Sequence, residues 1–192
     1  IGGFLAVSWT DTIQAGLMIF ALLLTPIITL LSFSDLSQVT LALEAARPQA
    51  LNLVGDLSWV AIISLMAWGL GYFGQPHILV RFMAVDSVKS IPNARRIGMT
   101  WMTLCLGGAV AAGFFGIAYF QQHPELAGVV NANPETVFME LTKILFNPWV
   151  AGVVLAAILA AVMSTLSCQL LVCSSTLTED FYKSFLRKNA SQ

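Results

Sequence analysis

Charged residues are scarce in this sequence. Asp, Glu, Lys and Arg together make up 10% of its 192 residues, whereas hydrophobic residues make up 57%, and the mean hydropathy is +0.81. The core of a soluble domain cannot account for so much apolar sequence, but segments of about 20 apolar residues that cross a bilayer can. The composition therefore predicts an all-α transmembrane protein with the lipid bilayer as its partner, and no nucleic-acid partner is expected.

Cysteine is scarce as well. The chain has 3 cysteines, and Cys105, Cys168 and Cys173 all lie in apolar segments without the spacing of a metal or redox motif. We interpret them as small buried packing residues, not as disulfide or metal-binding residues. No organic cofactor is expected from them.

The sequence also lacks an initiator methionine and a charged signal region, since it opens at Ile1-Gly2-Gly3-Phe4-Leu5. This opening predicts an internal fragment of a larger membrane domain. All of residues 1–192 are expected to belong to that one domain, and other helices would complete its function.

Long hydrophobic runs divide the chain into four expected spans. They cover about residues 8–33, 57–84, 98–120 and 148–175, each long enough to cross with some tilt. Basic residues gather between the second and third spans and after the fourth, so the positive-inside rule places segments 85–97 and 176–192 in the cytoplasm. These basic residues are Arg81, Lys89, Arg95, Arg96, Lys183, Arg187 and Lys188. Segments 34–56 and 121–147 are then expected on the outside.

The second span contains a sequence that is typical of a broken helix. Residues 68–77 read Trp-Gly-Leu-Gly-Tyr-Phe-Gly-Gln-Pro-His, with three glycines followed by Pro76. Glycine weakens a helix, and proline removes a backbone donor and clashes with the preceding turn, so backbone groups are freed at membrane depth. In secondary transporters such breaks hold substrate and coupling ion near the midplane of the bilayer. The alternative is a proline kink that serves packing alone.

The aromatic residues of this segment predict a binding face for a small solute. Trp68, Tyr72 and Pro76 are spaced by four residues and would share one side of a helix, with Gln75 beside them. Aromatic faces and free backbone groups suit a ligand that is apolar on one side and charged on the other. The alternatives are ordinary packing or an interfacial aromatic belt, although Trp68 lies too deep in the span for a belt.

Two adjacent hydroxyls in the fourth span predict a cation site. Ala161, Ser164, Thr165 and Cys168 recur at helical spacing on a stripe of small residues. Hydroxyl and carbonyl oxygens suit a hard cation such as sodium, and a bent helix would add the Ala161 carbonyl to the two hydroxyls. The alternative is that both hydroxyls donate to carbonyls one turn earlier, as Ser and Thr commonly do in membrane helices.

Asp11 is the only carboxylate within the apolar spans, where it follows Ser8-Trp9-Thr10. An ionisable residue at membrane depth is costly unless it is hydrated or paired, which makes Asp11 a functional candidate. The alternative is a solvated aspartate at the start of a helix, with Thr12 beside it.

The outer segment 121–147 is expected to hold a short amphipathic helix. Asn133-Pro134-Glu135 supplies an N-cap, a first-turn proline and an acidic residue, and apolar residues follow at helical spacing from Val137. Asn147-Pro148 repeats the cap and proline at the start of the fourth span. The short helix is predicted to be either a surface connector or a lid over an external vestibule, with Glu135 and Phe138 as the lid residues.

The third span carries small residues at Gly108, Ala112 and Gly116, spaced by four. Small residues at this spacing let two helices approach closely in a membrane. We therefore expect a packing face here and not a binding site.

Three of these motifs resemble signatures of the sodium/solute symporter family. They are Ser8-Trp9-Thr10-Asp11-Thr12-Ile13-Gln14-Ala15-Gly16, Gly71-Tyr72-Phe73-Gly74-Gln75-Pro76-His77 and Ala161-Val162-Met163-Ser164-Thr165. Each motif alone is moderately specific, and the three together, in the family's order, are far more so. The resemblance covers all 192 residues and is strongest to bacterial members that carry proline.

The resemblance implies a fold of the leucine-transporter type, with two inverted five-helix repeats around a central site. The first span would be the last helix of the first repeat, and the other three spans would begin the second repeat. The first core helix of the family, which completes both sites, would lie outside these residues.

The resemblance also implies roles for individual residues. The implied sodium ligands are Ala161, Ser164 and Thr165, with Asp11 as a transient site on the way to the cytoplasm. The implied proline contacts are Trp68, Tyr72 and Pro76, and Gln75 lies beside them.

The activity implied by the resemblance is sodium-coupled uptake of proline by alternating access across the bacterial inner (cytoplasmic) membrane. Sodium would be the coupling ion, and no enzymatic activity is expected. Two alternatives remain open: another solute such as a sugar or pantothenate, or a transporter-like sensor domain fused to a signalling module. An intramembrane protease is disfavoured, because an acid protease needs two aspartates at depth and a serine protease needs a histidine near Ser164, whereas His77 is predicted at the cytoplasmic end of its span.

Overall fold

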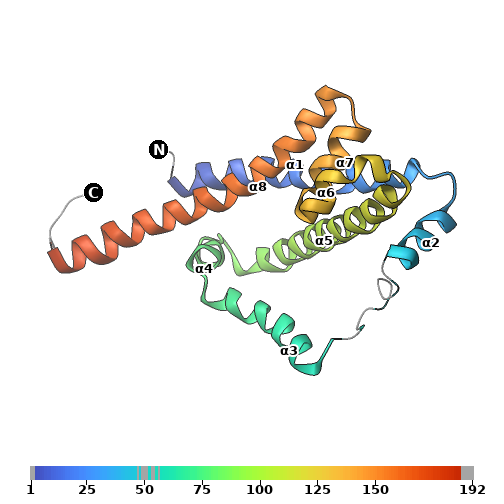
Figure 1. The fold of residues 1–192 in the computed structure, drawn as a ribbon. Coiled ribbons are helices and arrows are strands. Elements are labelled where there is room, and N and C mark those ends of the chain that lie inside the picture. The colour runs from blue at the N-terminus through green and yellow to red at the C-terminus, as the bar shows by residue number, and fades with distance from the viewer. Residues whose placement is uncertain (1–2, 47, 49–51, 53–54, 56, 187–192) are drawn as a thin grey trace.

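The computed structural model describes residues 3–46, 48, 52, 55 and 57–186, and within these residues it contains only helices and their connections (Figure 1). The α-helices are α1 (Gly3–Leu31), α2 (Leu36–Ala46), α3 (Trp59–Ala67), α4 (Pro76–Met83), α5 (Ile91–Gln122), α6 (Gly128–Ala132), α7 (Val137–Leu145) and α8 (Pro148–Ser175). Short 3-10 segments cover Trp68–Gly74, Val88–Ser90, Pro124–Leu126 and Pro134–Thr136, and a π-helical segment, Thr176–Leu186, continues α8. The predicted all-α class is confirmed for the described part of the chain.

Three helical stretches among the described residues are long and apolar enough to cross a membrane: Gly3–Leu31, Val88–Gln122 and Pro148–Leu186. They correspond to the predicted spans 8–33, 98–120 and 148–175. The predicted second span is divided into α3, a 3-10 segment and α4, so a crossing by residues 57–84 stays a prediction.

The start of α5 differs from the sequence prediction. Residues 91–97, predicted as part of an inner connection, form the first turns of α5. Pro92 fits at this point because the first turn of a helix does not need the backbone N–H that proline lacks. Arg95 and Arg96 favoured a connection because they are charged, yet arginine is a good helix former outside the hydrocarbon layer.

The predicted inner segment 176–192 is helical as far as Leu186. Arg187 and Lys188, which contribute to the positive-inside argument, lie outside the described residues, as do positions 47, 49–51, 53–54 and 56 of the predicted outer segment.

α1 and α8 pack against each other in antiparallel orientation, as Figure 1 shows. Buried Ala21 on α1 meets Val154 and Ala157 on α8, and Leu17 and Leu24 pack around them. These apolar residues recur at helical spacing on each helix, so one stripe of α1 lies along one stripe of α8.

The predicted small-residue face of α5 is confirmed. Gly108, Ala112 and Gly116 are all buried. A Cβ atom on Gly108 would lie 2.5 Å from the carbonyl oxygen of Leu22 on α1, and one on Gly116 would collide with the side chain of Val137 on α7. Glycine is therefore required at both positions for the helices to approach this closely.

α2, α6 and α7 gather at one end of the long helices, at the right of Figure 1, whereas the N-terminus and α4 lie toward the other end. At this end α2 buries Val39, Ala42 and Leu43 against Ala118 of α5. The sequence analysis predicts no element here, although these three apolar residues already have helical spacing. We call this the outer end after the predicted orientation, in which segments 34–56 and 121–147 share the outer side; that orientation stays a prediction.

Side chains cap the helices of this outer end. The predicted caps are confirmed, because Asn133 accepts a hydrogen bond from the backbone N–H of Glu135 and Asn147 accepts one from the N–H three residues later, both at 3.1 Å. Before α2, the Asp35 carboxylate accepts bonds from the hydroxyl and the backbone N–H of Ser37, at 2.6 and 3.2 Å. These bonds, the hydroxyl's first, hold the pKa of Asp35 below its ordinary value.

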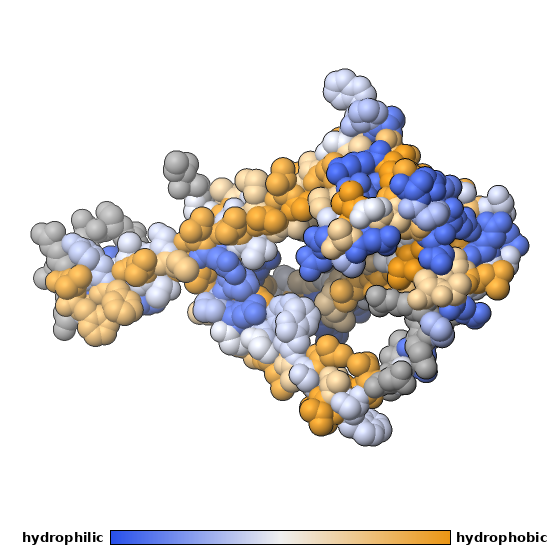
Figure 2. All heavy atoms as spheres, viewed as in Figure 1, coloured by the Kyte–Doolittle hydropathy of each residue, from blue (hydrophilic) through white to orange (hydrophobic). Residues whose placement is uncertain are grey.

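Hydrophobic and hydrophilic residues separate on the surface in Figure 2. Hydrophobic residues follow the length of α8, where Leu159 is exposed, and cover α3, where Trp59 is exposed. Hydrophilic residues gather over the end that holds α6 and α7. Exposed apolar faces of this extent fit contact with lipid or with further helices.

Candidate functional site

The break predicted in the second span is present. α3 ends at Ala67, Trp68–Gly74 has 3-10 geometry, Gln75 is extended with φ −89° and ψ 112°, and α4 begins at Pro76. Pro76 occupies the first turn of α4, where no backbone N–H is needed. Proline therefore starts a second helix, and the predicted clash with a preceding turn does not arise because the residue before it is extended.

The two aromatic residues of the break contact each other. The rings of Trp68 and Tyr72 meet edge to face, with centroids 5.2 Å apart and planes at 86°. The prediction of one shared side for Trp68, Tyr72 and Pro76 assumes α-helical geometry, whereas a 3-10 helix turns once in about three residues. In the structure Tyr72 and Gln75, three residues apart, line a cavity together, and Trp68 and Pro76 are not among its lining residues.

α8 is helical throughout the region of the hydroxyl pair. Ser164 Oγ donates to the Ala161 carbonyl oxygen at 2.9 Å, and Thr165 Oγ1 donates to the same oxygen at 3.2 Å. The structure thus shows the alternative arrangement, with both hydroxyls bonded one turn back, and α8 has no bend that frees this carbonyl. Three oxygen atoms nevertheless lie together on one side of α8.

The hydroxyl pair and the broken segment line the same cavity, which has a volume of about 510 Å³. The cavity brings together four of the predicted site residues, Tyr72, Gln75, Ser164 and Thr165. Its other lining residues are His77, Ile78, Arg81, Trp101, Cys168 and Gln169. A space of this size, with hydroxyl, amide and aromatic groups on its wall, has the dimensions and chemistry of a small-molecule site.

Asp11 has a charged partner. Arg81 Nη2 on α4 lies 2.5 Å from Asp11 Oδ2 on α1 and 2.7 Å from Cys168 Sγ on α8. The Asp11 side chain is 13% exposed, and α1 begins at Gly3, so Asp11 lies in the third turn and is not a helix-start residue. The arginine offsets the cost of placing a carboxylate among apolar helices. Three helices therefore meet at one charged contact beside the cavity.

The role of Arg81 was not predicted, because the positive-inside pattern places it in the cytoplasmic basic cluster. Arg81 and His77 are, however, the only basic side chains within residues 57–84. A lone carboxylate in one span and a lone arginine in another form a natural pair, because each lowers the cost of the other. This pairing of opposite charges is the sequence signal that could have predicted the Asp11–Arg81 contact.

His77 also differs from its predicted place. It lines the same cavity as Ser164 and is not remote from it. The Ser164 hydroxyl, however, donates to the Ala161 carbonyl, so its proton is not directed at an imidazole base as nucleophilic catalysis requires.

The two predicted lid residues lie at the outer end. Glu135 is exposed in the 3-10 turn before α7, and Phe138 in the first turn of α7 packs against the α1–α8 core formed by Ala21, Val154 and Ala157. The predicted amphipathic helix is therefore present as α7, and its function as a lid stays a prediction.

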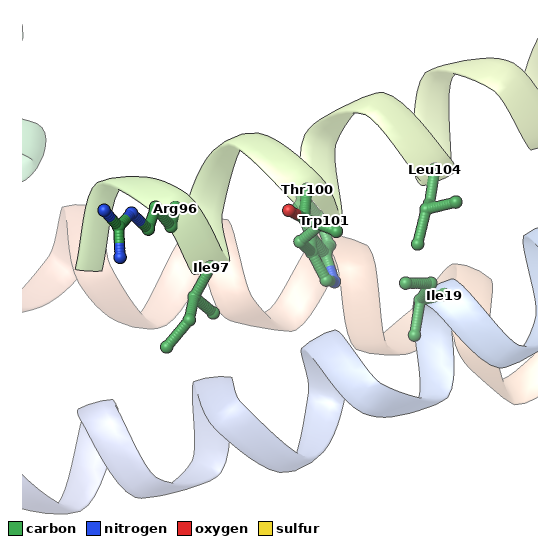
Figure 3. Close-up of a pocket in the computed structure, with 6 residues that line it drawn as sticks. All are labelled: Ile19, Arg96, Ile97, Thr100, Trp101 and Leu104. Carbon is green, nitrogen blue, oxygen red and sulfur yellow. The ribbon is translucent and has the colours of Figure 1, made fainter. Parts of the chain in front are cut away.

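A second hollow of about 370 Å³ lies between α1 and α5 (Figure 3). It is lined by Ile19 of α1 and by Arg96, Ile97, Thr100, Trp101 and Leu104 of α5. Trp101 also lines the larger cavity. The indole Nε1 of Trp101 donates to the Ala15 carbonyl at 3.1 Å. This hollow holds none of the predicted site residues.

A helix broken at glycine and proline, facing a continuous helix with paired hydroxyls across a cavity, is typical of secondary transporters. The comparison with known families agrees with this class. The sequence model of the sodium:solute symporter family matches residues 1–192, and the chain belongs to that family.

Individual relatives carry more specific names. The chain is 67% identical to the sodium/proline symporter of Escherichia coli K12 over 192 residues, which are 100% of this chain and 38% of that protein. It is 52% identical to the high-affinity proline transporter of Bacillus subtilis and 46% identical to that organism's osmoregulated proline transporter, over 190 residues each. Each of these two alignments covers 99% of this chain; they cover 39% of the high-affinity transporter and 38% of the osmoregulated transporter.

The chain thus spans about two fifths of the length of the curated relatives it matches. No solved structure matches it at a significant level.

Proposed function

We propose that the protein containing this segment takes up proline together with sodium, by alternating access across the bacterial inner membrane. The observation that carries the proposal is the shared cavity, in which Tyr72 and Gln75 from the broken segment face Ser164 and Thr165 from α8. The names of the relatives, which are proline transporters and sodium/proline symporters, support the choice of solute and ion.

Sodium would bind to oxygens of α8. Ser164 Oγ and Thr165 Oγ1 already lie within 3.2 Å of the Ala161 carbonyl oxygen, so three oxygens that could bind a cation lie close together. Each hydroxyl oxygen retains lone pairs while it donates its proton, and oxygen ligands suit a hard cation. Helices outside this chain would complete the coordination.

Proline would bind against the broken segment. The ring of Tyr72, which Trp68 contacts edge to face, would pack on the apolar side of the pyrrolidine ring. Gln75 would hydrogen-bond the charged end of the solute, and Pro76 would fix the direction in which α4 leaves the break. Trp68 and Pro76 are not among the residues that line the cavity, so they would contact proline only after a shift of this segment.

The architecture that suits this function is the leucine-transporter type, with two inverted repeats. Residues 57–84 would then cross the membrane as a fourth span in two half-helices, α3 and α4. Asp11 would receive sodium transiently on the cytoplasmic side, and Glu135 and Phe138 would act as a lid on the outer side. In such transporters substrate and ion bind where helices are interrupted.

The test is uptake of labelled proline by the full-length protein in proteoliposomes, with an inward sodium gradient or an equal potassium gradient. We expect uptake above the equilibrium level with sodium alone, and competition by unlabelled proline but not by a sugar or pantothenate. Uptake that ignores sodium would overturn the ion assignment. Absence of labelled-proline uptake, together with sodium-driven uptake of a labelled sugar or pantothenate, would overturn the solute assignment, and binding without flux would favour a sensor.

A further inference from the structure

Gln14 lies one turn from Asp11 on α1, in a place that the proposed function leaves without a role. Its side-chain oxygen Oε1 is buried and has no hydrogen-bond donor within the described part of the chain. Asp11 Oδ1 is buried and lacks a donor in the same way, because Arg81 and Cys168 both contact the other carboxylate oxygen, Oδ2. Two buried acceptor oxygens one turn apart are costly unless a donor or a cation satisfies them.

Two contacts set the register between α1 and α8 around this pair of oxygens. Near the start of α1, Asp11 Oδ2 lies 3.4 Å from Cys168 Sγ. Further along, Ala21 packs against Val154 and Ala157. As residue numbers rise along α1 they fall along α8, so the level of any residue between these contacts can be derived.

The register places Gln14 level with the hydroxyl pair. Gln14 is three residues from Asp11 in the direction of Ala21, and Thr165 and Ser164 are three and four residues from Cys168 in the matching direction. One helical turn on each helix separates the two levels. The stripe of α1 that meets α8 contains Asp11, and the three-residue step keeps Gln14 on that stripe.

We propose, resting on the sodium-coupled function above, that Gln14 is a positioning residue for the departing ion. Its amide oxygen accepts sodium from the hydroxyls of Ser164 and Thr165 and passes it to the free oxygen of Asp11. An amide oxygen is a neutral ligand, so it holds a cation weakly enough to release it, as successive sites along a conduction path must. The path runs along α1 from the cavity to the Asp11–Arg81 contact.

The experiment separates steps that release sodium from steps that do not. Full-length protein in proteoliposomes is assayed for net sodium-driven proline uptake, and for exchange of labelled for unlabelled proline with saturating sodium on both sides. Gln14→Leu removes the amide at similar volume, and Gln14→Glu keeps an oxygen in place. Gln121→Leu makes the same chemical change at an exposed position on the outer end of α5 and serves as the control.

We expect Gln14→Leu to slow net uptake by about tenfold, while exchange and the external proline concentration for half-maximal uptake change by less than about twofold. Gln14→Glu should recover only part of the net rate, because it keeps an oxygen ligand but holds sodium more tightly than an amide does, and Gln121→Leu should match the wild type. Equal losses of uptake and exchange in Gln14→Leu, or an unchanged net rate, would overturn the role of Gln14 while sodium-dependent uptake by the wild type still stands.

A wild type without sodium-dependent uptake would overturn both proposals. If Gln14→Leu does not accumulate as folded protein, Gln14→Glu still gives a decision. A second carboxylate beside Asp11 should lower the cytoplasmic sodium concentration for half-maximal proline efflux by severalfold. An unchanged value would contradict an ion path past residue 14.

Discussion

The glycines of α5 and those of the broken segment serve opposite purposes. A Cβ atom on Gly108 or Gly116 would collide with a neighbouring helix, whereas a Cβ atom on Gly69, Gly71 or Gly74 would meet nothing within 4 Å. In α5 glycine permits close packing and so contributes to stability. In the broken segment it permits a change of backbone path, and the same residue type therefore marks the scaffold in one region and the candidate site in the other.

α5 and the broken segment also differ in how many of their residues are buried. α5 buries residues through its second half, from Cys105 to Phe120, while α3, the 3-10 segment and α4 bury none. What ties the broken segment to the long helices is the contact of α4 with α8 and the Arg81–Asp11 ion pair. Within the described residues, the broken segment is thus joined to the long helices by this contact and this ion pair and not through buried apolar residues, which distinguishes it from α5.

The largest effect is expected from Gly108→Leu. The new side chain would start 2.5 Å from the Leu22 carbonyl oxygen, so α1 and α5 would have to separate, at a cost of about 3 kcal/mol or more. The yield of monodisperse full-length protein and its melting temperature in detergent should both fall. Gly107→Leu, next to it on an open face of α5, is the control and should behave like the wild type. Similar stability of the two variants would refute the packing role of this face.

Removing a hydroxyl of the candidate ion site should have the next largest effect. Ser164→Ala and Thr165→Ala should each raise the sodium concentration for half-maximal uptake by about tenfold, which corresponds to about 1.4 kcal/mol, and Thr165→Ser should be milder. Thr103→Ala on α5 is a matched control, because its hydroxyl also donates to a carbonyl one turn earlier, at 2.9 Å, but lies outside the cavity. Unchanged sodium dependence in both α8 variants, at normal expression, would remove these hydroxyls from the site.

Asp11→Asn is expected to have a moderate effect. It keeps the shape of the side chain but deletes the charge that Arg81 contacts, so it should slow sodium-coupled turnover and weaken apparent sodium affinity severalfold. Solute recognition should be largely spared, and Asp11→Glu should retain part of the activity. Asp35→Asn at the outer end provides a carboxylate control. A normal rate and sodium response in Asp11→Asn would reduce Asp11 to a structural residue.

The smallest effect is expected from Gly71→Ala. The added methyl group meets nothing within 4 Å, and alanine favours a helix over glycine by about 1 kcal/mol, so folding should not suffer. The proline concentration for half-maximal uptake should rise by less than about threefold, since only the balance between 3-10 and α geometry changes. A loss of folded protein comparable to that of Gly108→Leu would remove the distinction between the two groups of glycines.

Features with local signals were predictable from the sequence. Glycine and proline placed the break before Pro76, asparagine followed by proline placed the starts of the 134–136 turn and of α8, and the spacing of Gly108 and Gly116 indicated their packing face. Each of these signals depends on residues within a few positions of one another, so no knowledge of the tertiary structure is needed.

Features that depend on tertiary contacts were not predictable in this way. Arg81 and Asp11 are 70 positions apart, and only the packing of α4 on α8 and α1 brings them together. Because Trp68–Gly74 is a 3-10 helix, residues three positions apart lie on the same side of it, and not residues four apart. Over so short a segment, the pattern of apolar residues does not distinguish a 3-10 helix from an α-helix. α2 was overlooked although Val39, Ala42 and Leu43 have helical spacing, and its partner, Ala118, lies on a distant helix that local sequence does not reveal.

The most direct test of the shared cavity is equilibrium binding of labelled proline to the full-length protein at a series of sodium concentrations. If Tyr72 contacts proline and Thr165 contacts sodium in one cavity, sodium should raise proline affinity in the wild type. Tyr72→Ala should weaken proline binding at every sodium concentration, whereas Thr165→Ala should shift or abolish the sodium dependence, as coupled sites require. Proline affinity in the wild type that is the same with and without sodium would contradict the account.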